Sequence, residues 1–344
     1  MTVDRFETVQ QSLGQEPRTW LVTGAAGFIG SHLAERLLHL GQTVVGLDNF
    51  ATGKRENLAA IERSVGGSAW RRFSFVTGDI RALDTCRSCT RGVDFVLHQA
   101  ALGSVPRSMS DPLTSHAVNV DGFLTMLEAA RAEKVRRIVY ASSSSVYGDS
   151  TASPKREEDV GAVLSPYAAT KAVNELYGQL WHRAYGLETV GLRYFNVFGA
   201  RQDPEGPYAA VIPRWLAHLA ARTPCVIYGD GTTSRDFCYI ENVVRANILA
   251  AVSPGVSGET FNIACGDTTS LNDLYAALSQ AASERLGIPL PRARYEEFRA
   301  GDIKHSLASI DKASRMLGYT PSIKVATGLA RTVDAFFDAS PAQS

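Results

Sequence analysis

The sequence of 344 residues predicts an α/β fold, in which a doubly wound parallel sheet is followed by a smaller α/β C-terminal lobe. Two observations support this prediction. Short apolar runs alternate with patterns of helical period, and a glycine-rich turn follows the first of these runs. Strands that alternate with helices in this way form a parallel sheet with helices on both faces.

The first strand and the helix after it show the pattern best. The strand is expected at residues 19–23, after a polar N-terminal arm of residues 1–18. In the helix, Leu33 and Leu37 recur at helical spacing, and Gly41 stands where a C-cap glycine belongs. Further strands are expected at 43–48, 73–79, 94–100, 136–142 and 188–195. Long helices are expected over 113–134 and 165–185.

From about residue 200 the alternation loosens. Residues 201–215 have the composition of a loop. After them we expect a strand at 225–229, a helix after "RDFCYIEN", a strand at 259–264, and helices near 270–285 and 325–338. We therefore divide the chain into the arm (1–18), a large domain (19–199) to which 236–265 can return, and the C-terminal lobe (200–344).

Composition limits the partners of the chain. Thirty-five basic residues balance thirty-five acidic ones, which argues against general binding to nucleic acid or to an anionic membrane. No apolar run approaches the roughly 20 residues of a membrane span. The polar N-terminus has no signal-peptide core, so we expect a cytoplasmic protein. Cys86 and Cys89 form a C-x-x-C that no second pair or histidine cluster completes, so we interpret the spacing as chance and expect no metal.

The turn "VTGAAGFIG" places Gly24, Gly27 and Gly30 between the first strand and its helix. In this context one glycine allows the sharp turn, another lets backbone amides approach a pyrophosphate, and the third lets helix and strand pack closely. The helix N-terminus then points its positive dipole end at the phosphates. The spacing is G-x-x-G-x-x-G instead of G-x-G-x-x-G. The turn predicts a Rossmann-type dinucleotide site.

Asp48 ends the second strand in "GLDNF". A carboxylate at that position accepts hydrogen bonds from the adenosine ribose and repels a 2′-phosphate. Asp48 therefore favours NAD over NADP as the dinucleotide.

The segment "LSPYAATKAVNELYG" places Tyr167 and Lys171 one turn apart on an expected helix. By itself the pair is equally typical of an amphipathic helix with a snorkelling lysine. Its chemical interpretation depends on the rest of the chain.

The rest of the chain resembles a known family. In order along the chain stand "TGAAGFIGSHL", "LDNF", "GDIR", "HQAA", "SSSSVYG", "YAATK" and "LRYFNVFG". With these motifs the chain resembles the extended short-chain dehydrogenase/reductase family over about residues 19–338. The best match is the branch of nucleotide-sugar epimerases, and within it the bacterial UDP-N-acetylglucosamine 4-epimerases.

This resemblance implies bound NAD as the cofactor. It implies that Asp79 and Ile80 bracket the adenine and that Asn119 supports the active-site side. The implied NAD-binding residues are Gly24, Gly27, Phe28, Ile29, Gly30, Asp48, Asn49, Phe50, Asp79, Ile80, Gln99, Ala100, Ala101, Asn119, Tyr167, Lys171 and Tyr194.

The resemblance also implies a catalytic group of Ser143, Tyr167 and Lys171. Free tyrosine, with a pKa near 10, is a poor base at neutral pH. We expect the Lys171 ammonium and the positive nicotinamide ring to lower the pKa of Tyr167, which makes it a plausible general base. Ser143 would hydrogen-bond the same sugar hydroxyl and help to hold it near Tyr167.

The implied substrate is a UDP-sugar, with its phosphates held by Arg235 and Arg299 and by the amide of Asn196. Tyr228 would stack on uracil, and Asp302 would accept from the uridine ribose. The implied substrate-binding residues are Gly103, Ser104, Ser143, Ser144, Ser145, Tyr167, Asn196, Gln202, Ala210, Val211, Val226, Tyr228, Arg235, Arg299, Asp302 and Ser306.

Ser306 bears on which sugar fits. Epimerases restricted to UDP-glucose and UDP-galactose carry a tyrosine at the matching position, by the resemblance, and its ring closes the space beside C2. A serine leaves room for an N-acetyl group, to which the small residues Gly103, Ser104 and the run Tyr208–Ala210 add.

Competing activities differ in the residues they need. Dehydratases of the family carry an Asp-Glu pair directly after the residue that matches Ser143, whereas here Ser144 and Ser145 follow it. The expected reaction is therefore C4 epimerisation of UDP-N-acetylhexosamines through a 4-keto sugar, with weaker action on UDP-glucose and UDP-galactose. Other NAD-dependent UDP-sugar enzymes, a hexuronate epimerase or a decarboxylase, remain as alternatives, as does a non-catalytic NAD-binding protein. The resemblance further implies a homodimer through the helices at 113–134 and 165–185.

Overall fold

The computed structural model describes residues 4–204, 210–298 and 304–339. Its first half contains, in order, α1 (Arg5–Gln15), β1 (Thr19–Thr23), α2 (Phe28–His39), β2 (Thr43–Asp48), α3 (Arg55–Trp70), β3 (Phe73–Thr77), α4 (Leu83–Thr90), β4 (Phe95–His98), α5 (Val105–Ser110), α6 (Pro112–His116), the π-helical turn Ala117–Asp121, α7 (Gly122–Ala132), β5 (Arg137–Ser143), the 3₁₀ turn Ser144–Tyr147, α8 (Pro166–Tyr185) and β6 (Glu188–Tyr194). The rest contains β7 (Val197–Phe198), α9 (Val211–Ala220), β8 (Val226–Tyr228), β9 (Ser234–Arg235), β10 (Cys238–Tyr239), α10 (Ile240–Val252), β11 (Thr260–Ile263), β12 (Thr269–Ser270), α11 (Leu271–Leu286), β13 (Arg294–Glu296), β14 (His305–Ser306), α12 (Asp311–Leu317) and α13 (Val325–Ala339).

A seven-stranded parallel sheet forms the centre of the molecule, in the order β11-β6-β5-β4-β1-β2-β3. This confirms the predicted α/β fold with a Rossmann-type sheet. The strand order reverses between β1 and β4, which lie side by side although they are not consecutive in the chain. In open α/β sheets, ligands bind at such a switch point, outside the carboxyl ends of the strands.

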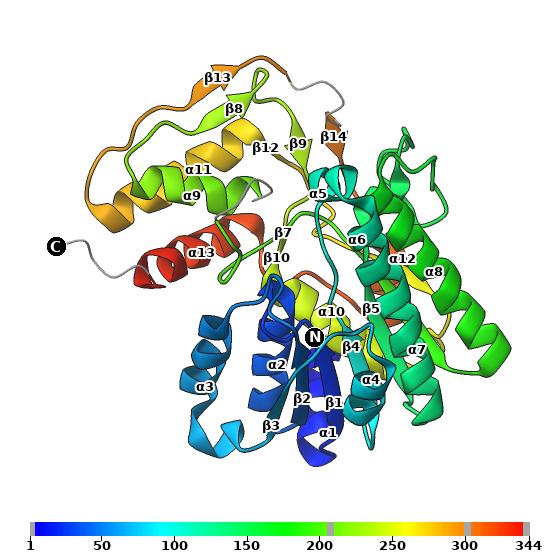
Figure 1. Ribbon diagram of the computed structural model, residues 1–344. Helices are drawn as coiled ribbons and strands as arrows, with labels where there is room; N and C mark the ends of the chain where they lie inside the picture. The colour runs from blue at the N-terminus through cyan, green and yellow to red at the C-terminus, as the bar shows by residue number, and fades with distance from the viewer. Residues whose placement is uncertain (1–3, 205–209, 299–303, 340–344) are drawn as a thin grey trace.

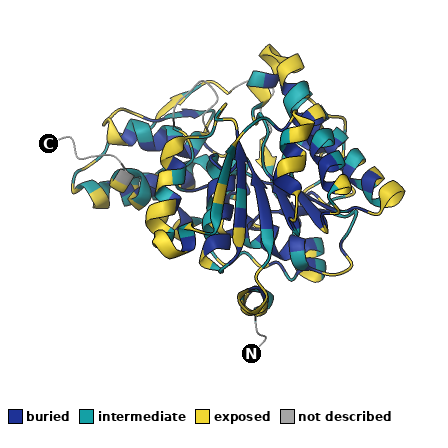
Figure 2. Cartoon of the chain, turned by 60° about the horizontal axis from the view of Figure 1, so that its bottom comes forward, coloured by how far each residue is buried: buried dark blue, intermediate teal, exposed yellow. Residues whose placement is uncertain are grey.

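The sheet is buried on both faces. Along β1, Trp20 and Val22 belong to one hydrophobic core, whereas Leu21 belongs to the other. The first core includes α2 and α10, and the second includes α4 and α7. Because side chains alternate along a strand, an apolar strand such as β1 can supply both cores. Figure 2 shows the buried strands between two layers of helices, whose outer surfaces are exposed.

Short sheets build the region beyond the carboxyl ends of the large sheet, where α9, α11 and α13 lie with β8 and β13 (Figure 1). They pair β10 with β7, β13 with β8, and β9 with both β12 and β14. In the segment at 236–265, α10 packs against α2, and β11 forms the edge of the large sheet beside β6.

Three local expectations differ from the structure. The polar arm contains the helix α1, because Phe6 and Leu13 on one side of it are buried against the protein. Residues expected to be loop at 201–215 include the start of α9, whose Ile212 and Leu216 pack into the core. The helix expected over 113–134 is interrupted by the π-helical turn Ala117–Asp121. Among the described residues, no helix is long and apolar enough to cross a bilayer.

Candidate active site

A cavity of about 440 Å³ opens at the switch point of the sheet, where the loops after β1, β2, β3 and β4 meet. Most of the residues expected to bind NAD line this cavity: Gly24, Gly27, Phe28, Ile29, Gly30, Asp48, Asn49, Asp79, Ile80, Gln99, Ala100 and Ala101. Gly103, expected on the substrate side, lines it as well. Sequence reasoning missed Ala51, Thr52, Gly78, Arg81, Leu102, Thr114 and Val118.

The glycine turn leaves no room for side chains. Gly24 has a φ of +69°, and a Cβ at Gly30 would lie 2.0 Å from the Gly24 carbonyl oxygen. Gly27 is the N-cap of α2, and no side chain caps the first N–H groups of that helix. A bare helix N-terminus beside a tight glycine turn suits a pyrophosphate, so the residues present fit a dinucleotide.

Asp48 stands at the carboxyl end of β2 and lines the cavity. Its Oδ2 accepts from the Ala26 N–H at 3.0 Å, and its Oδ1 accepts from the Phe50 N–H at 2.7 Å. Asp48 therefore fixes the loop after β1 and the loop after β2. Its carboxylate retains lone pairs that can accept from ribose hydroxyls.

Asp79 forms a second fixed carboxylate after β3. Arg81 binds it in a forked pair, with Nε–Oδ1 at 2.9 Å and Nη2–Oδ2 at 2.7 Å, and Asn49 donates to Oδ2 at 3.1 Å. The hydrogen bond from Arg81 lowers the pKa of Asp79 to about 2, so its carboxylate is ionised at neutral pH. The position of Arg81 in "GDIR" was the signal that could have found it.

Ser143 and Tyr167 come together from two elements. Ser143 ends β5, and Tyr167 lies in the first turn of α8, which begins there because Ser165 caps it and Pro166 follows. The Tyr167 N–H also donates to Ser108 Oγ at 3.0 Å. Burial raises the pKa of Tyr167, and a hydrogen bond with the Ser143 side chain opposes that rise.

Lys171 lies one turn further along α8, with its Nζ 5.9 Å from the Tyr167 ring centroid. Nζ donates to the Ala141 carbonyl oxygen at 2.8 Å. Burial lowers the pKa of Lys171 to about 8, against the attraction of Glu175. Lys171 is not among the groups that set the pKa of Tyr167 here: burial raises this pKa and Ser143 opposes the rise, so the phenol stays protonated at neutral pH and the expected lowering by Lys171 stays a prediction.

Five residues expected to bind NAD lie outside the lining of the cavity: Tyr167 and Lys171, described above, and Asn119, Tyr194 and Phe50. Asn119 is buried in the π-helical turn, where its Oδ1 accepts from the Leu102 N–H and its Nδ2 donates to Thr170 Oγ1. It thus ties the chain after β4 to α8. Tyr194 is buried, and its hydroxyl donates to Gln99 Oε1 at 3.1 Å. The Phe50 ring packs against Phe75.

The expected substrate residues come together only in part. Ser306 on β14 is the register partner of Arg235 on β9, whose Nη1 donates to the Ser234 and Lys304 carbonyls. Asn196 donates its amide to the Asp236 carbonyl at 3.0 Å. Of the others, Ser104 caps α5, Ser144 and Ser145 lie in the 3₁₀ turn, Ala210 and Val211 start α9, and Val226 and Tyr228 lie on β8. Arg299, Asp302, Tyr208 and Ala209 lie outside the described residues.

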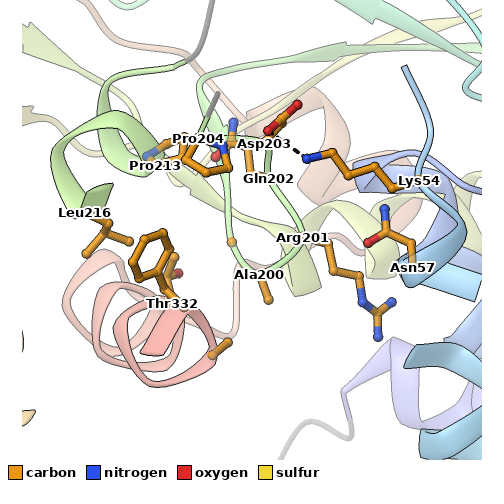
Figure 3. Close-up of a pocket in the computed structure, with 13 residues that line it drawn as sticks. Lys54, Asn57, Ala200, Arg201, Gln202, Asp203, Pro204, Pro213, Leu216 and Thr332 are labelled. Atoms are coloured by element: carbon orange, nitrogen blue, oxygen red, sulfur yellow. Dashed lines mark hydrogen bonds and ion pairs between the residues drawn. The ribbon is translucent and has the colours of Figure 1, made fainter. Parts of the chain in front are cut away.

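Gln202 does not join the cavity at the switch point. It lines a separate pocket of about 230 Å³, with Lys54 and Asn57 on one side and Pro213, Leu216 and Thr332 among the residues on the other (Figure 3). Its Nε2 donates to the Val197 carbonyl at 3.1 Å, and its Oε1 is buried without a partner. Its expected contact with substrate stays a prediction.

Cys86 and Cys89 are buried on α4, and the Cys86 thiol donates to the Ile80 carbonyl. Burial raises the pKa of Cys86 to about 12. In the described part of the chain, no group of three or more His, Cys, Asp or Glu residues could hold a metal ion.

Comparison with known proteins gives this arrangement a family. The NAD dependent epimerase/dehydratase family matches residues 20–264. The chain belongs to this family. The predicted fold and the predicted cofactor, NAD, are confirmed at this level.

Relatives of known name cover nearly the whole chain. The chain is 39% identical to a UDP-glucose 4-epimerase of Mycolicibacterium smegmatis, over 92% of this chain and 97% of that protein. It is 35% identical to a UDP-glucuronate 4-epimerase of Thermodesulfobacterium geofontis, over 92% and 95%. The solved structure of a UDP-N-acetylglucosamine 4-epimerase from Methanobrevibacter ruminantium, in complex with UDP-N-acetylmuramic acid, superimposes with a TM-score of 0.86. That chain is 36% identical, and the match covers 94% of this chain and 99% of that one.

These relatives support NAD-dependent epimerisation of UDP-sugars at C4 as the activity of the chain. They differ in the sugar that their names carry, so the choice of sugar depends on the residues of this chain.

Proposed function

We propose that the chain interconverts UDP-N-acetylglucosamine and UDP-N-acetylgalactosamine at C4, with weaker action on UDP-glucose and UDP-galactose. The single observation that carries the choice of sugar is Ser306, a small residue that is paired in register with Arg235. Arg235 is a candidate phosphate ligand, so this pairing supports a position of Ser306 beside the substrate. The NAD-lined cavity and the 4-epimerase relatives support the reaction itself.

Ser143, Tyr167 and Lys171 would carry the proton chemistry. Ser143 holds the C4 hydroxyl of the sugar beside Tyr167, and Tyr167 accepts its proton and later returns it. Lys171 binds the nicotinamide ribose and adds positive charge near the phenol. NAD held in this site would supply the hydride acceptor for C4 and the donor for the opposite face of the 4-keto sugar. Its positive ring also favours the phenolate, which this buried site disfavours on its own.

The two serines after Ser143 support epimerisation over elimination. Ser144 and Ser145 occupy a 3₁₀ turn, and the Oγ of Ser145 is buried without a hydrogen-bond partner among the described residues. Neither side chain can act as an acid or base on the carbon next to C4. These residues therefore favour an oxidised sugar that turns and accepts the hydride again over one that eliminates water.

The uridine diphosphate is proposed to lie against the C-terminal lobe, built mainly from residues 200–344 without the segment at 236–265. β8 and β9 supply Tyr228 and Arg235 to that side. The fixed carboxylates of Asp48 and Asp79 lie on the NAD side.

A UDP-hexuronate 4-epimerase is the second candidate. The 35% identity to a UDP-glucuronate 4-epimerase over 92% of the chain favours it. A decarboxylase acting on a UDP-hexuronate is the related alternative. All of these candidates share the same NAD site and the same first oxidation, and their sugars differ in the groups at C2 and C6.

A Ser306→Tyr variant tests the choice of sugar. The ring would fill the space beside C2, so we expect kcat/KM to fall for UDP-N-acetylglucosamine and to stay nearly unchanged for UDP-glucose. The difference should be roughly 1–3 kcal/mol, the usual scale for blocking a small pocket. His305→Tyr is the matched control, because neighbouring residues on a strand point to opposite faces. Full activity of Ser306→Tyr on the acetylated sugar would rule out this gate.

A further inference from the structure

Asp236 follows β9 directly and is completely buried. Its Oδ1 accepts from the Cys265 N–H at 2.8 Å, and its Oδ2 accepts from the Gly266 N–H at 3.0 Å and from the Ala308 N–H at 3.4 Å. Its backbone carbonyl accepts from the Asn196 amide at 3.0 Å. One residue therefore connects four segments that are far apart in the sequence.

Three of these four segments carry or border a candidate substrate residue. Arg235 precedes Asp236, Asn196 bonds to its carbonyl, and Ser306 lies two residues before Ala308. Within the described ranges, no lysine or arginine forms an ion pair with Asp236. Backbone N–H groups therefore stabilise this buried charge, and they can do so only while the chains that carry them stay in place.

We propose that Asp236 is a positioning residue for the UDP-sugar site, whose ionised carboxylate holds Asn196, Arg235 and Ser306 in their relative positions. The proposal rests on the function proposed above, because it assigns these three residues to the substrate. Asp236 itself does not touch the sugar; it acts through the strands that it joins.

The protonation of Asp236 makes this role sensitive to pH. Burial raises the pKa of Asp236 to about 6, against the N–H donors of Cys265, Ala308 and Gly266. As the pH falls through this value, the carboxyl gains a proton. A protonated oxygen facing an N–H donor loses its hydrogen bond, so the segments loosen.

The other ionisable groups around Asp236 come from several elements. Cys238 of β10 has its pKa raised by its hydrogen bond with Cys265 and by burial, and burial raises the pKa of Tyr319. The exposed Asp267 carboxylate repels Asp236 and contributes to its raised pKa. The positive charge of Lys324 contributes to lowering the pKa of Cys265. Arg235 directs its guanidinium to the carbonyls of Ser234 and Lys304.

Binding of UDP-N-acetylglucosamine to a Tyr167→Phe variant, which does not turn over, measures the effect without catalysis. Calorimetry between pH 5 and pH 8 should show Kd rising about tenfold from pH 7 to pH 5, since only about a tenth of Asp236 is ionised one unit below its pKa. Neither phosphate of a UDP-sugar titrates in this range, so the dependence reports the protein. In active enzyme the same change should appear in KM and much less in kcat.

Two further substitutions in that background identify the group responsible. Asp236→Asn should weaken binding about tenfold at pH 7 and remove the pH dependence, while bound NAD is retained. Asp267→Asn, the matched control, should bind normally at pH 7 and should move the midpoint to lower pH, because it removes a like charge. If Asp236→Asn fails to fold, the role of Asp236 is still tested by the pH profile of Kd in the Tyr167→Phe protein and by the shift of its midpoint in Asp267→Asn.

The outcomes separate the two proposals. Binding of a UDP-sugar that is independent of pH from 5 to 8 would overturn the role of Asp236 and leave the proposed function intact. No binding of any UDP-sugar would overturn the proposed function, and the role of Asp236 with it.

Discussion

Burial sets the charge of the two groups on which the proposed chemistry depends. It raises the pKa of Tyr167 and lowers the pKa of Lys171 to about 8. In the protein alone, the lysine therefore loses its proton before the tyrosine does. A protonated Lys171 and the positive nicotinamide ring are both needed to bring the phenol toward its ionised form.

The pH dependence of turnover should follow Lys171. Its ammonium form is complete well below pH 8 and is lost as the pH rises through that value, so kcat/KM should fall on the alkaline side with a midpoint near 8. Lys171→Arg is the informative variant: arginine stays protonated, so its remaining activity should not fall in this range. The measurement is kcat/KM from pH 6 to pH 10. A flat wild-type profile up to pH 9.5 would contradict this assignment.

The candidate residues that sequence reasoning found are those whose role is local. Gly24, Gly27 and Gly30 were found because a tight turn between strand and helix leaves a fixed spacing. Asp236 was missed because its donors come from residues 29 to 72 positions away, and no local pattern records such a contact. Gln202 was assigned to the substrate by resemblance alone. It lines the pocket beside Lys54 and Leu216 and not the cavity at the switch point.

Among the elements, the turn between β1 and α2 has the least freedom. A Cβ at Gly30 would meet the Gly24 carbonyl oxygen at 2.0 Å and its carbonyl carbon at 2.7 Å. Both are backbone atoms, so no rotamer change can relieve the contact. The turn must open, and the pyrophosphate site opens with it.

Gly30→Ala should therefore lose bound NAD and some stability, by roughly 1–3 kcal/mol as for other overpacked sites. Denaturing the purified wild-type protein should release NAD that was never added, and the variant should release little. Gly14→Ala is the matched control, since nothing lies within 4 Å of a Cβ there. It should keep NAD and unfold at the same temperature or higher. NAD in the Gly30→Ala protein at the wild-type level, or mainly NADP in the wild type, would contradict this account of the site.

The inner strands of the large sheet could be predicted because burial on both faces makes them nearly continuous apolar runs, whereas β3 at the edge is only partly buried. The π-helical turn Ala117–Asp121 could not be predicted. It adds only one residue to a helical turn, so the spacing of apolar residues hardly differs from that of the helices around it. α1 and α9 were missed for another reason. Their helices are stabilised by packing against distant segments, and such packing overrides local composition.

At the scale of the whole molecule, one exposed face is unusually apolar. On α8, Leu176 and Leu180 stand one turn apart, 66% and 45% exposed, and Leu113 of the neighbouring α6 is 82% exposed. This face belongs to the helices through which we propose that two chains pair. Large exposed apolar side chains on such helices are consistent with a protein–protein interface.

A double variant, Leu176→Glu with Leu180→Glu, should separate the proposed dimer, because it brings four carboxylates into one apolar contact. Light scattering at micromolar concentration should give the mass of two chains for the wild type and of one chain for the variant. Leu83→Glu, at an exposed position on α4, is the control and should leave the dimer intact. A wild-type protein that is monomeric at that concentration would refute the proposed pairing.

The central claim is that the chain oxidises and reduces the same carbon of a UDP-N-acetylhexosamine. It is tested most directly by incubating the protein with UDP-N-acetylglucosamine deuterated at C4 and following the sugar by NMR. The account predicts UDP-N-acetylgalactosamine with deuterium still at C4, since the transferred hydride returns within the closed site. Tyr167→Phe should form none. Loss of deuterium to solvent, or conversion of UDP-glucuronate with UDP-N-acetylglucosamine left unchanged, would contradict it.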